Sequence, residues 1–189
     1  MKRIVSLVLV FVLAFVAVTA CVGGGKSNED QASDLLNRGL QEHNDGNLDA
    51  AAATYHELLR KDPQNKFAFY NLGLIDQTNG KFQPAENNYR LALSIDPDFN
   101  AALFNLAIVR TQAGDTKEAI SLYRHAISVA PDSAGAHLNL GLLLRGEGNE
   151  TEAAAEFKLA IALDPAIASR LGPPAATSPA GAATPTPAN

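Results

Sequence analysis

Four asparagines carry the side chains with the clearest capacity for recognition chemistry, because they return at a fixed interval of 34 residues. They are Asn37, Asn71, Asn105 and Asn139. A carboxamide holds both a donor and an acceptor, so each can bind the N–H and the C=O of a peptide main chain together. A fixed period of this size indicates that the chain repeats one supersecondary unit. The elements that position the asparagines must therefore be read from that repeat.

Residue types that serve catalysis or metal binding are present, but their spacing favours neither. The four histidines share no phase of the period; they are His43, His56, His125 and His137. The sequence contains no C-x-x-C, H-E-x-x-H or G-x-S-x-G motif and no glycine-rich phosphate loop. We therefore expect no enzymatic activity, no catalytic residue, no metal site and no cofactor.

Several other positions keep the same 34-residue step. They are the glycines 46, 80, 114 and 148, the alanines 51, 85, 119 and 153, the aromatics Tyr55, Tyr89, Tyr123 and Phe157, and the prolines 63, 97, 131 and 165. Between them, apolar residues follow helical spacing. The glycine is suited to end one helix in a left-handed conformation, and the proline stops the next. Each unit is thus predicted to be a helical hairpin.

This pattern resembles the tetratricopeptide repeat (TPR) family, whose 34-residue unit carries Leu-Gly, then Ala, an aromatic and Pro. Four units fit, at 32–65, 66–99, 100–133 and 134–167. The resemblance implies an all-α fold, a right-handed α-solenoid of four TPR helix-turn-helix repeats. The departures from the family pattern are Arg38, Leu58, Ala107 and His137. His137 replaces the family's frequent Trp, so we expect it in the core.

The resemblance also implies where a ligand binds. In the family the first helices line a concave groove that takes extended peptides, and the sixth position of each unit, held here by the asparagines, points into it. They resemble the asparagine ladder of the O-linked N-acetylglucosamine transferase superhelix, which grips a peptide main chain. The alternative is that they bond the neighbouring unit. Apolar residues complete the predicted groove, namely Tyr70, Phe104 and Leu138 at the fifth position and Leu74, Ile108 and Leu142 at the ninth. Part of this stripe alternatively packs as core between units.

The N-terminus has the layout of an export signal. Lys2 and Arg3 precede an apolar stretch, which predicts a signal peptide over residues 1–20. The sequence Val-Thr-Ala-Cys at 18–21 resembles the lipobox of bacterial lipoproteins. The resemblance implies that Cys21, the only cysteine, carries acyl chains such as palmitate, and that residues 21–31 form a lipid-anchored flexible tether. The alternative is an uncleaved membrane helix, because residues 4–22 hold no charge.

Charge and the lipobox together suggest a location. Without residues 1–20 the chain holds 13 basic and 20 acidic residues, which argues against nucleic acid as a partner. An anionic membrane would repel it, so acyl chains would supply the attachment. The protein is expected outside the cytoplasm of a bacterium. Val22 lacks the aspartate associated with inner-membrane retention, which favours the periplasmic side of the outer membrane in a Gram-negative cell, and otherwise the outer face of the cell membrane.

The end of the array is predicted to be poorly covered. Leu159 and Leu163 are expected to be exposed unless the short segment after the fourth unit folds back or a second protein covers it. Residues 168–189 are predicted to be that short segment and then a disordered tail rich in Pro, Ala and Thr, partly polyproline-like. The tail is either a simple solvated segment or an O-glycosylated stalk.

The sequence thus predicts a membrane-anchored scaffold for protein–protein interaction. It would bind an extended peptide or a partner helix in the concave groove, and assist the assembly or localisation of a cell-envelope complex, as pilotin-like lipoproteins of similar build do. The alternative is a structural lipoprotein that forms a homodimer through its fourth repeat.

Overall fold

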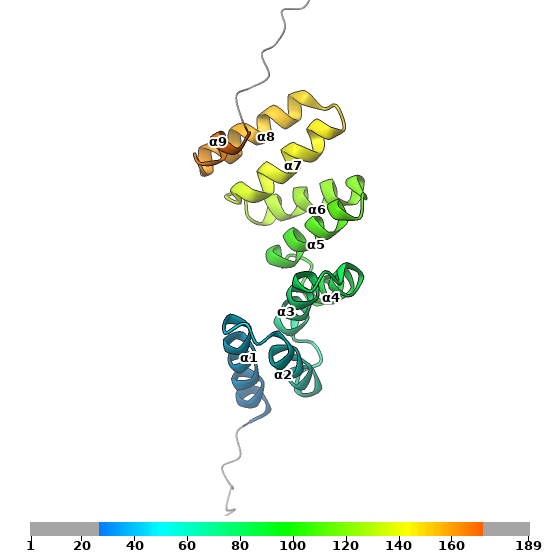
Figure 1. The fold of residues 1–189 in the computed structure, drawn as a ribbon, viewed down its shortest axis with the longest axis vertical. Coiled ribbons are helices and arrows are strands. Elements are labelled where there is room, and N and C mark those ends of the chain that lie inside the picture. The colour runs from blue at the N-terminus through cyan, green and yellow to red at the C-terminus, as the bar shows by residue number, and fades with distance from the viewer. Residues whose placement is uncertain (1–26, 172–189) are drawn as a thin grey trace, which may run out of the picture.

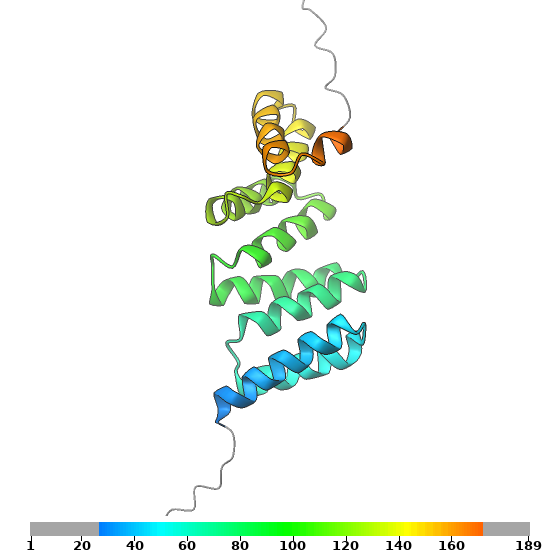
Figure 2. The same ribbon diagram turned by 90° about the vertical axis from the view of Figure 1, so that its left-hand side faces the viewer.

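The computed structural model describes residues 27–171, and every regular element in that range is an α-helix. Eight helices form four antiparallel hairpins, which pair α1 (Asn28–Asn44) with α2 (Leu48–Lys61), α3 (Lys66–Thr78) with α4 (Phe82–Ile95), α5 (Asn100–Gln112) with α6 (Thr116–Val129), and α7 (Ala134–Gly146) with α8 (Glu150–Leu163). The short α9 (Ile167–Leu171) follows. The hairpins stack along the long axis (Figures 1 and 2), which confirms the predicted all-α solenoid.

The turn inside each hairpin is set by one glycine. Gly46, Gly80, Gly114 and Gly148 have φ angles of 78°, 71°, 79° and 81°, which a residue with a Cβ rarely adopts. The next N–H reaches back five residues; in the second hairpin Lys81 N–H donates to the carbonyl of Asp76 at 2.8 Å. This is the bonding of a Schellman C-cap, so the glycines end the first helices as the sequence predicts.

The two helices of the second hairpin approach closely because a glycine faces a tyrosine. A Cβ placed on Gly73 would lie 2.6 Å from Cε1 of Tyr89, and the Tyr89 side chain is fully buried. Gly39 meets Tyr55, and Gly141 meets Phe157, in the same way. A glycine against an aromatic ring is therefore the packing unit of these hairpins.

The array begins earlier than the repeat predicts. Helix α1 starts at Asn28, because Ser27 and Asp30 form a capping box: the Ser27 hydroxyl accepts the Asp30 N–H, and the Asp30 carboxylate accepts the Ser27 N–H. The prediction of a flexible tether over 21–31 is wrong for residues 28–31, which form the first turn of α1. By contrast, α3, α5 and α7 begin at residues 66, 100 and 134, the first residues of the second, third and fourth predicted units.

The array ends with a helix that folds back. Ile167 of α9 is 2% exposed and packs with Leu138 and Ala160, while Phe157 and Ile161 of α8 lie against the same cluster. The face of α8 that would receive a fifth unit is thus partly covered by α9. This is the folding back that the sequence left open.

Leu159 and Leu163 are 47% and 43% exposed, as predicted, but for another reason. The same positions of earlier units hold Leu91 and Val129, which are 45% and 38% exposed although further units follow them. These side chains therefore lie on the outer surface of the solenoid, and their exposure does not come from a missing neighbour.

The predicted signal peptide, Cys21 and the proline-rich tail lie outside the described residues. Within residues 27–171, no helix has the length and apolar character needed to cross a membrane.

Candidate functional site

The predicted asparagine ladder uses its amide N–H groups inside the molecule. Nδ2 of Asn71 donates to the carbonyl of Phe67 at 2.7 Å, and Nδ2 of Asn105 donates to the carbonyl of Ala101 at 2.9 Å. Asn105 also reaches the hydroxyl of Tyr70 in the preceding unit at 3.2 Å. The bond from Asn105 to Tyr70 reaches the neighbouring unit, which is the alternative that the sequence left open, whereas the bonds to Phe67 and Ala101 lie within the asparagines' own helices.

The fourth unit extends the same arrangement, and the first departs from it. Nδ2 of Asn139 donates to the hydroxyl of Tyr123, in the preceding unit, at 3.1 Å. Asn37, in the first unit, is exposed. Three of the four asparagines are therefore fixed in orientation by the fold.

The acceptor half of each fixed amide stays open. Within the described part of the chain no donor is bonded to Oδ1 of Asn71, Asn105 or Asn139, and none of these oxygens is fully buried. A carboxamide oxygen facing solvent can accept the N–H of a peptide main chain. The fold thus holds the side chains in place by their nitrogen, and within the described residues the oxygen accepts no hydrogen bond.

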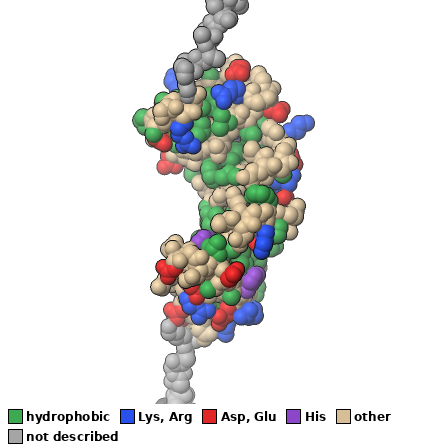
Figure 3. Space-filling model, viewed as in Figure 1, with side chains coloured by type: hydrophobic (Ala, Val, Ile, Leu, Met, Phe, Trp, Pro, Cys, Tyr) green, Lys and Arg blue, Asp and Glu red, His purple; other side chains and the backbone are tan. Residues whose placement is uncertain are grey.

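A cavity of about 280 Å³ brings several predicted groove residues together between the third and fourth units. Its walls are Ile108, Thr111, Gln112, Tyr123, Asn139, Leu142 and Leu143. Leu142 is 40% exposed and gives the cavity an apolar rim. Tyr123, one of the repeated aromatics, contributes to the wall and accepts the Asn139 Nδ2–H through its hydroxyl oxygen. The space-filling view is hollowed on its left side, between the first hairpin and the later units (Figure 3).

The remaining apolar positions divide between groove and core. Leu74 and Tyr70 pack against the buried cluster of Tyr89, Leu106 and Val109. Phe104 meets Tyr123 edge to face at 5.8 Å between ring centroids and stays partly exposed. These side chains pack between units, as one alternative from the sequence states, and they also present part of their surface to solvent.

Leu138 does not belong to the groove surface. It is only 7% exposed, because Ile167 of α9 packs over it together with Ala160. The prediction that Leu138 lines the groove is corrected for this reason. The open apolar surface of the fourth unit is supplied by Leu142 instead.

Sequence reasoning missed an aromatic edge, which we define as Phe67, Tyr70 and Phe99. The Phe67 and Tyr70 rings meet the Phe99 ring edge to face, at 5.6 and 5.2 Å between centroids. Nζ of Lys66 lies 5.1 Å from the centroids of both Phe67 and Phe99, and it is paired with Asp96 at 2.5 Å. The available signal was that the Phe67 position holds small residues in the other three units, and that the Phe99 position holds Asn65 and Ser133 in the first and third units.

Burial raises the pKa of the tyrosine hydroxyls along the array. It raises the pKa of Tyr55 to about 12, and it also raises the pKa of Tyr70, Tyr89 and Tyr123. These phenols are therefore neutral at physiological pH. Tyr70, which accepts a hydrogen bond from Asn105, keeps its own proton for donation.

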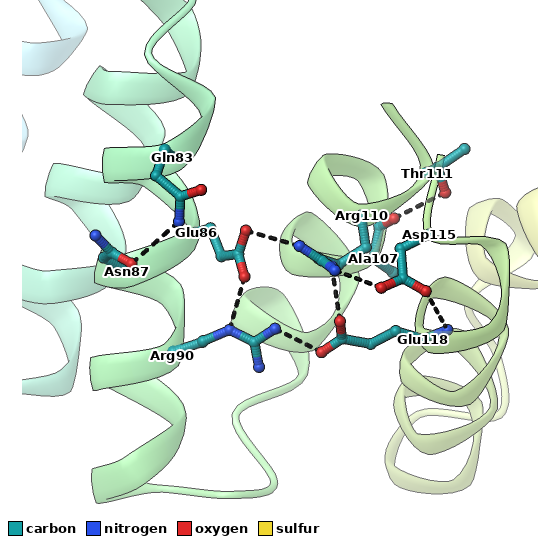
Figure 4. A network of polar contacts seen from close by, with 9 residues as sticks. All are labelled: Gln83, Glu86, Asn87, Arg90, Ala107, Arg110, Thr111, Asp115 and Glu118. Carbon is teal, nitrogen blue, oxygen red and sulfur yellow. Dashed lines mark hydrogen bonds and ion pairs between the residues drawn. The ribbon is translucent and has the colours of Figure 1, made fainter. Parts of the chain in front are cut away.

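An ion-pair network fixes the second unit against the third (Figure 4). Glu86 of α4 accepts from Arg90 and from Arg110 of α5, each at 2.9 Å. Glu118 of α6 pairs with Arg90 at 2.6 Å and with Arg110 at 2.7 Å, and Asp115 also pairs with Arg110. Burial alone would raise the pKa of Glu86, but hydrogen bonds from the two arginines outweigh it and hold that pKa below its ordinary value.

Two of the four histidines, His125 and His137, make contacts within the fold. His137 is 4% exposed, with Nδ1 2.6 Å from a Glu156 carboxylate oxygen and Nε2 3.0 Å from the carbonyl of Pro131, which confirms it as a core residue. Nε2 of His125 lies 2.8 Å from Asp98 on the surface. Within residues 27–171 no three His, Cys, Asp or Glu side chains are grouped as a metal site requires.

The family model for the tetratricopeptide repeat matches residues 70–128 and 112–166, more than half of the chain. The chain belongs to the tetratricopeptide repeat family. The family's repeat fold is a scaffold for protein–protein interaction, and this TPR chain has that fold. No curated protein matches the sequence of this TPR protein.

Solved structures share the fold. A crystal structure of MamA is 25% identical with a TM-score of 0.65, over 73% of this TPR chain and 81% of that chain. The structure of PilF from Pseudomonas aeruginosa is 22% identical with a TM-score of 0.65, over 73% and 63%, and this likeness shows the fold alone. An O-GlcNAc transferase from Thermobaculum terrenum is 25% identical with a TM-score of 0.58, over 64% of this chain but 23% of that one.

Proposed function

We propose that this chain is a membrane-anchored scaffold that binds an extended peptide or a partner helix in its concave groove, and that it assists the assembly or localisation of a cell-envelope complex. The observation that carries the groove is the cavity between α5 and α7. There an open amide oxygen on Asn139 lies among apolar side chains, Ile108 and Leu142. One polar contact to the main chain beside apolar pockets suits an extended peptide.

The spacing of the ladder sets the length of the ligand. Neighbouring helices pack about 8–10 Å apart and an extended chain rises about 3.3 Å per residue, so each asparagine serves about three ligand residues. Asn105 and Asn139, which are oriented and partly exposed, therefore suit about six residues of an extended segment, whereas Asn71 is only 7% exposed and is left out. The ligand presents main-chain N–H groups to the open oxygens and apolar side chains to the groove walls.

Affinity capture from an envelope extract tests the groove. The bait is the full chain, either wild type or Asn105→Ala/Asn139→Ala, and retained proteins are identified by mass spectrometry. Asn87→Ala is the matched control, because Asn87 is an exposed asparagine on α4. A protein retained by wild type and by the control, but lost from the double variant, supports the groove. Equal retention by all three baits would reject the groove as the binding site.

Membrane anchoring is proposed from the lipobox resemblance at Cys21. A Cys21→Ser variant should move from the membrane fraction to the soluble fraction and should fail to incorporate labelled palmitate. A variant that stays in the membrane without label would favour the uncleaved membrane helix, and the lipid anchor would then be withdrawn.

A second candidate function is self-association through the fourth unit. Leu159 and Leu163 expose apolar surface one helical turn apart, which favours a contact on the outer face of α8. Light scattering on the full chain in detergent, compared with a Leu159→Asp/Leu163→Asp variant, tests it. A dimer that the variant converts to a monomer supports this candidate, and a monomer in both cases rejects it.

A further inference from the structure

The aromatic edge of Phe67, Tyr70 and Phe99 is more than the fold requires. Phe67 is 44% exposed even though it contacts Phe99. The same position in the other three units holds Ser33, Ala101 and Gly135, so the hairpin packs without an aromatic there. Phe67, Tyr70 and Phe99 contact one another through the Phe99 ring, and a contiguous apolar patch of this kind at the surface is typical of a binding site.

Phe67 stands between two open cavities. One, of about 440 Å³, is lined by residues of α1 and by Lys61; the α1 residues are Asn28, Glu29, Ala32, Ser33 and Leu36. The other, of about 400 Å³, is lined by Gln64, Lys66 and Ile95. Both share Asp62, Asn65 and Phe67. The ring is thus a ridge with a hollow on each side.

This shape fits a proline-rich segment in the polyproline II conformation. Such segments dock on aromatic-lined grooves with proline rings in the hollows beside an aromatic ring. They lack many N–H groups but carry free carbonyls, which accept from donors such as Lys61 and Gln64 at the cavity walls. Preset backbone angles lower the entropy lost on binding.

We propose that the occupant is the chain's own proline-rich tail. Residues 172–189 hold five prolines and no charge, and the sequence predicts partial polyproline character for them. Their uncharged side chains suit the Phe67 ridge, where the nearest cation, Lys66, is already paired with Asp96. The same molecule therefore carries both an aromatic edge and a proline-rich segment that can dock on it.

The repeat places the start of the tail at the correct edge of the solenoid. Leu171 occupies the phase of Phe69, two residues after Phe67, three units further along. Three unit steps of roughly 10 Å separate them by about 30 Å along the stack. The 18 residues of the tail span up to about 56 Å as a polyproline helix, which is enough to follow the curve of the superhelix.

Tail docking would cover the first-unit half of the concave face. A ligand that needs this half must displace the tail, so the tail acts as a tethered competitor. An attached segment has an effective concentration of order millimolar; for an intrinsic Kd near 100 μM, it lowers the apparent affinity for an added peptide about tenfold. The inference concerns units 1 and 2 and does not depend on the proposed ligand of the cavity between α5 and α7.

The test uses a labelled synthetic peptide of residues 172–189 and fluorescence anisotropy. It is titrated into the full wild-type chain and into a full-length variant with alanine at all five tail prolines, residues 173, 174, 179, 185 and 187. The variant should bind the peptide, and wild type should bind it about tenfold more weakly. A peptide without prolines should bind neither.

Phe67→Ala, added to the proline-free variant, should reduce peptide binding at least tenfold. Phe82→Ala is the matched control, since Phe82 is also 44% exposed but lies at the start of α4. Circular dichroism verifies that both variants fold. No binding by the proline-free variant, equal binding by that variant and wild type, or equal binding after Phe67→Ala each overturns the proposal. These outcomes do not depend on whether the asparagine variants retain the envelope partner. Tail docking at the aromatic edge and ligand binding between α5 and α7 can therefore be rejected independently.

Discussion

Gly73 has no room for a side chain, because its Cα faces the ring of Tyr89. The Tyr89 hydroxyl donates to Gln77 Oε1 at 2.7 Å, which holds the ring in place. Gly73→Ala should therefore lower the free energy of unfolding by about 1–3 kcal/mol through overpacking, measured by urea denaturation. The matched control is Gly146→Ala, since a Cβ there meets nothing within 4 Å. A Gly73→Ala protein as stable as the Gly146→Ala protein would show that the ring moves freely.

The buried tyrosines make stability depend on alkaline pH. Burial raises the pKa of Tyr55 to about 12 and raises the pKa of Tyr89 and Tyr123, whereas an exposed phenol has a pKa of about 10. The unfolded chain therefore loses these protons first, and stability, complete below about pH 10, falls as the pH rises toward 12. An alkaline titration should show tyrosinate absorbance of these residues rising together with the loss of helical circular dichroism. Their ionisation near pH 10 in a protein that stays helical would contradict this account.

At the scale of the elements, Glu86 joins α4 to α5 through two arginines. Glu86→Gln removes the charge from a side chain that is only 8% exposed and leaves Arg90 and Arg110 with weaker partners. We expect the free energy of unfolding to fall by about 1–3 kcal/mol, measured by urea denaturation at low salt. Glu57→Gln breaks the exposed pair with Arg38 and should cost less than about 1 kcal/mol. Equal effects of the two changes would mean that the network adds nothing beyond a surface ion pair.

The elements themselves were largely predictable from the sequence. The repeated glycine and proline fixed where the helices end, and Asp115 and Asn149 cap α6 and α8 by accepting the N–H three residues later. These signals are local, so a one-dimensional pattern contains them. The contact of Glu86 with Arg110 joins two hairpins, and Phe67 meets Phe99 at the N-cap of α5. The geometry of both contacts depends on how the units stack, which the period alone does not contain.

At the scale of the whole molecule, the groove was predicted in outline and corrected in detail. That the sixth position binds a ligand stays a prediction, and only the structure shows that the amide nitrogens are used inside the fold while the oxygens accept no bond from the described residues. Leu138 was misassigned because a five-residue helix covers it, and so short an element has no periodic signal of its own. Leu159 and Leu163 are exposed because they lie on the outer surface of the solenoid, and not because the array ends there.

The central claim is that a partner binds the concave groove, and site-specific photocrosslinking tests it most directly. A photoreactive phenylalanine analogue replaces either Leu142, in the groove, or Leu91, on the outer surface; the two leucines are 40% and 45% exposed. Each full-length variant is irradiated in intact cells and probed for covalent adducts. The account predicts a discrete protein adduct at position 142 and none at position 91. An adduct at position 91 alone would place the partner on the outer face and contradict the account.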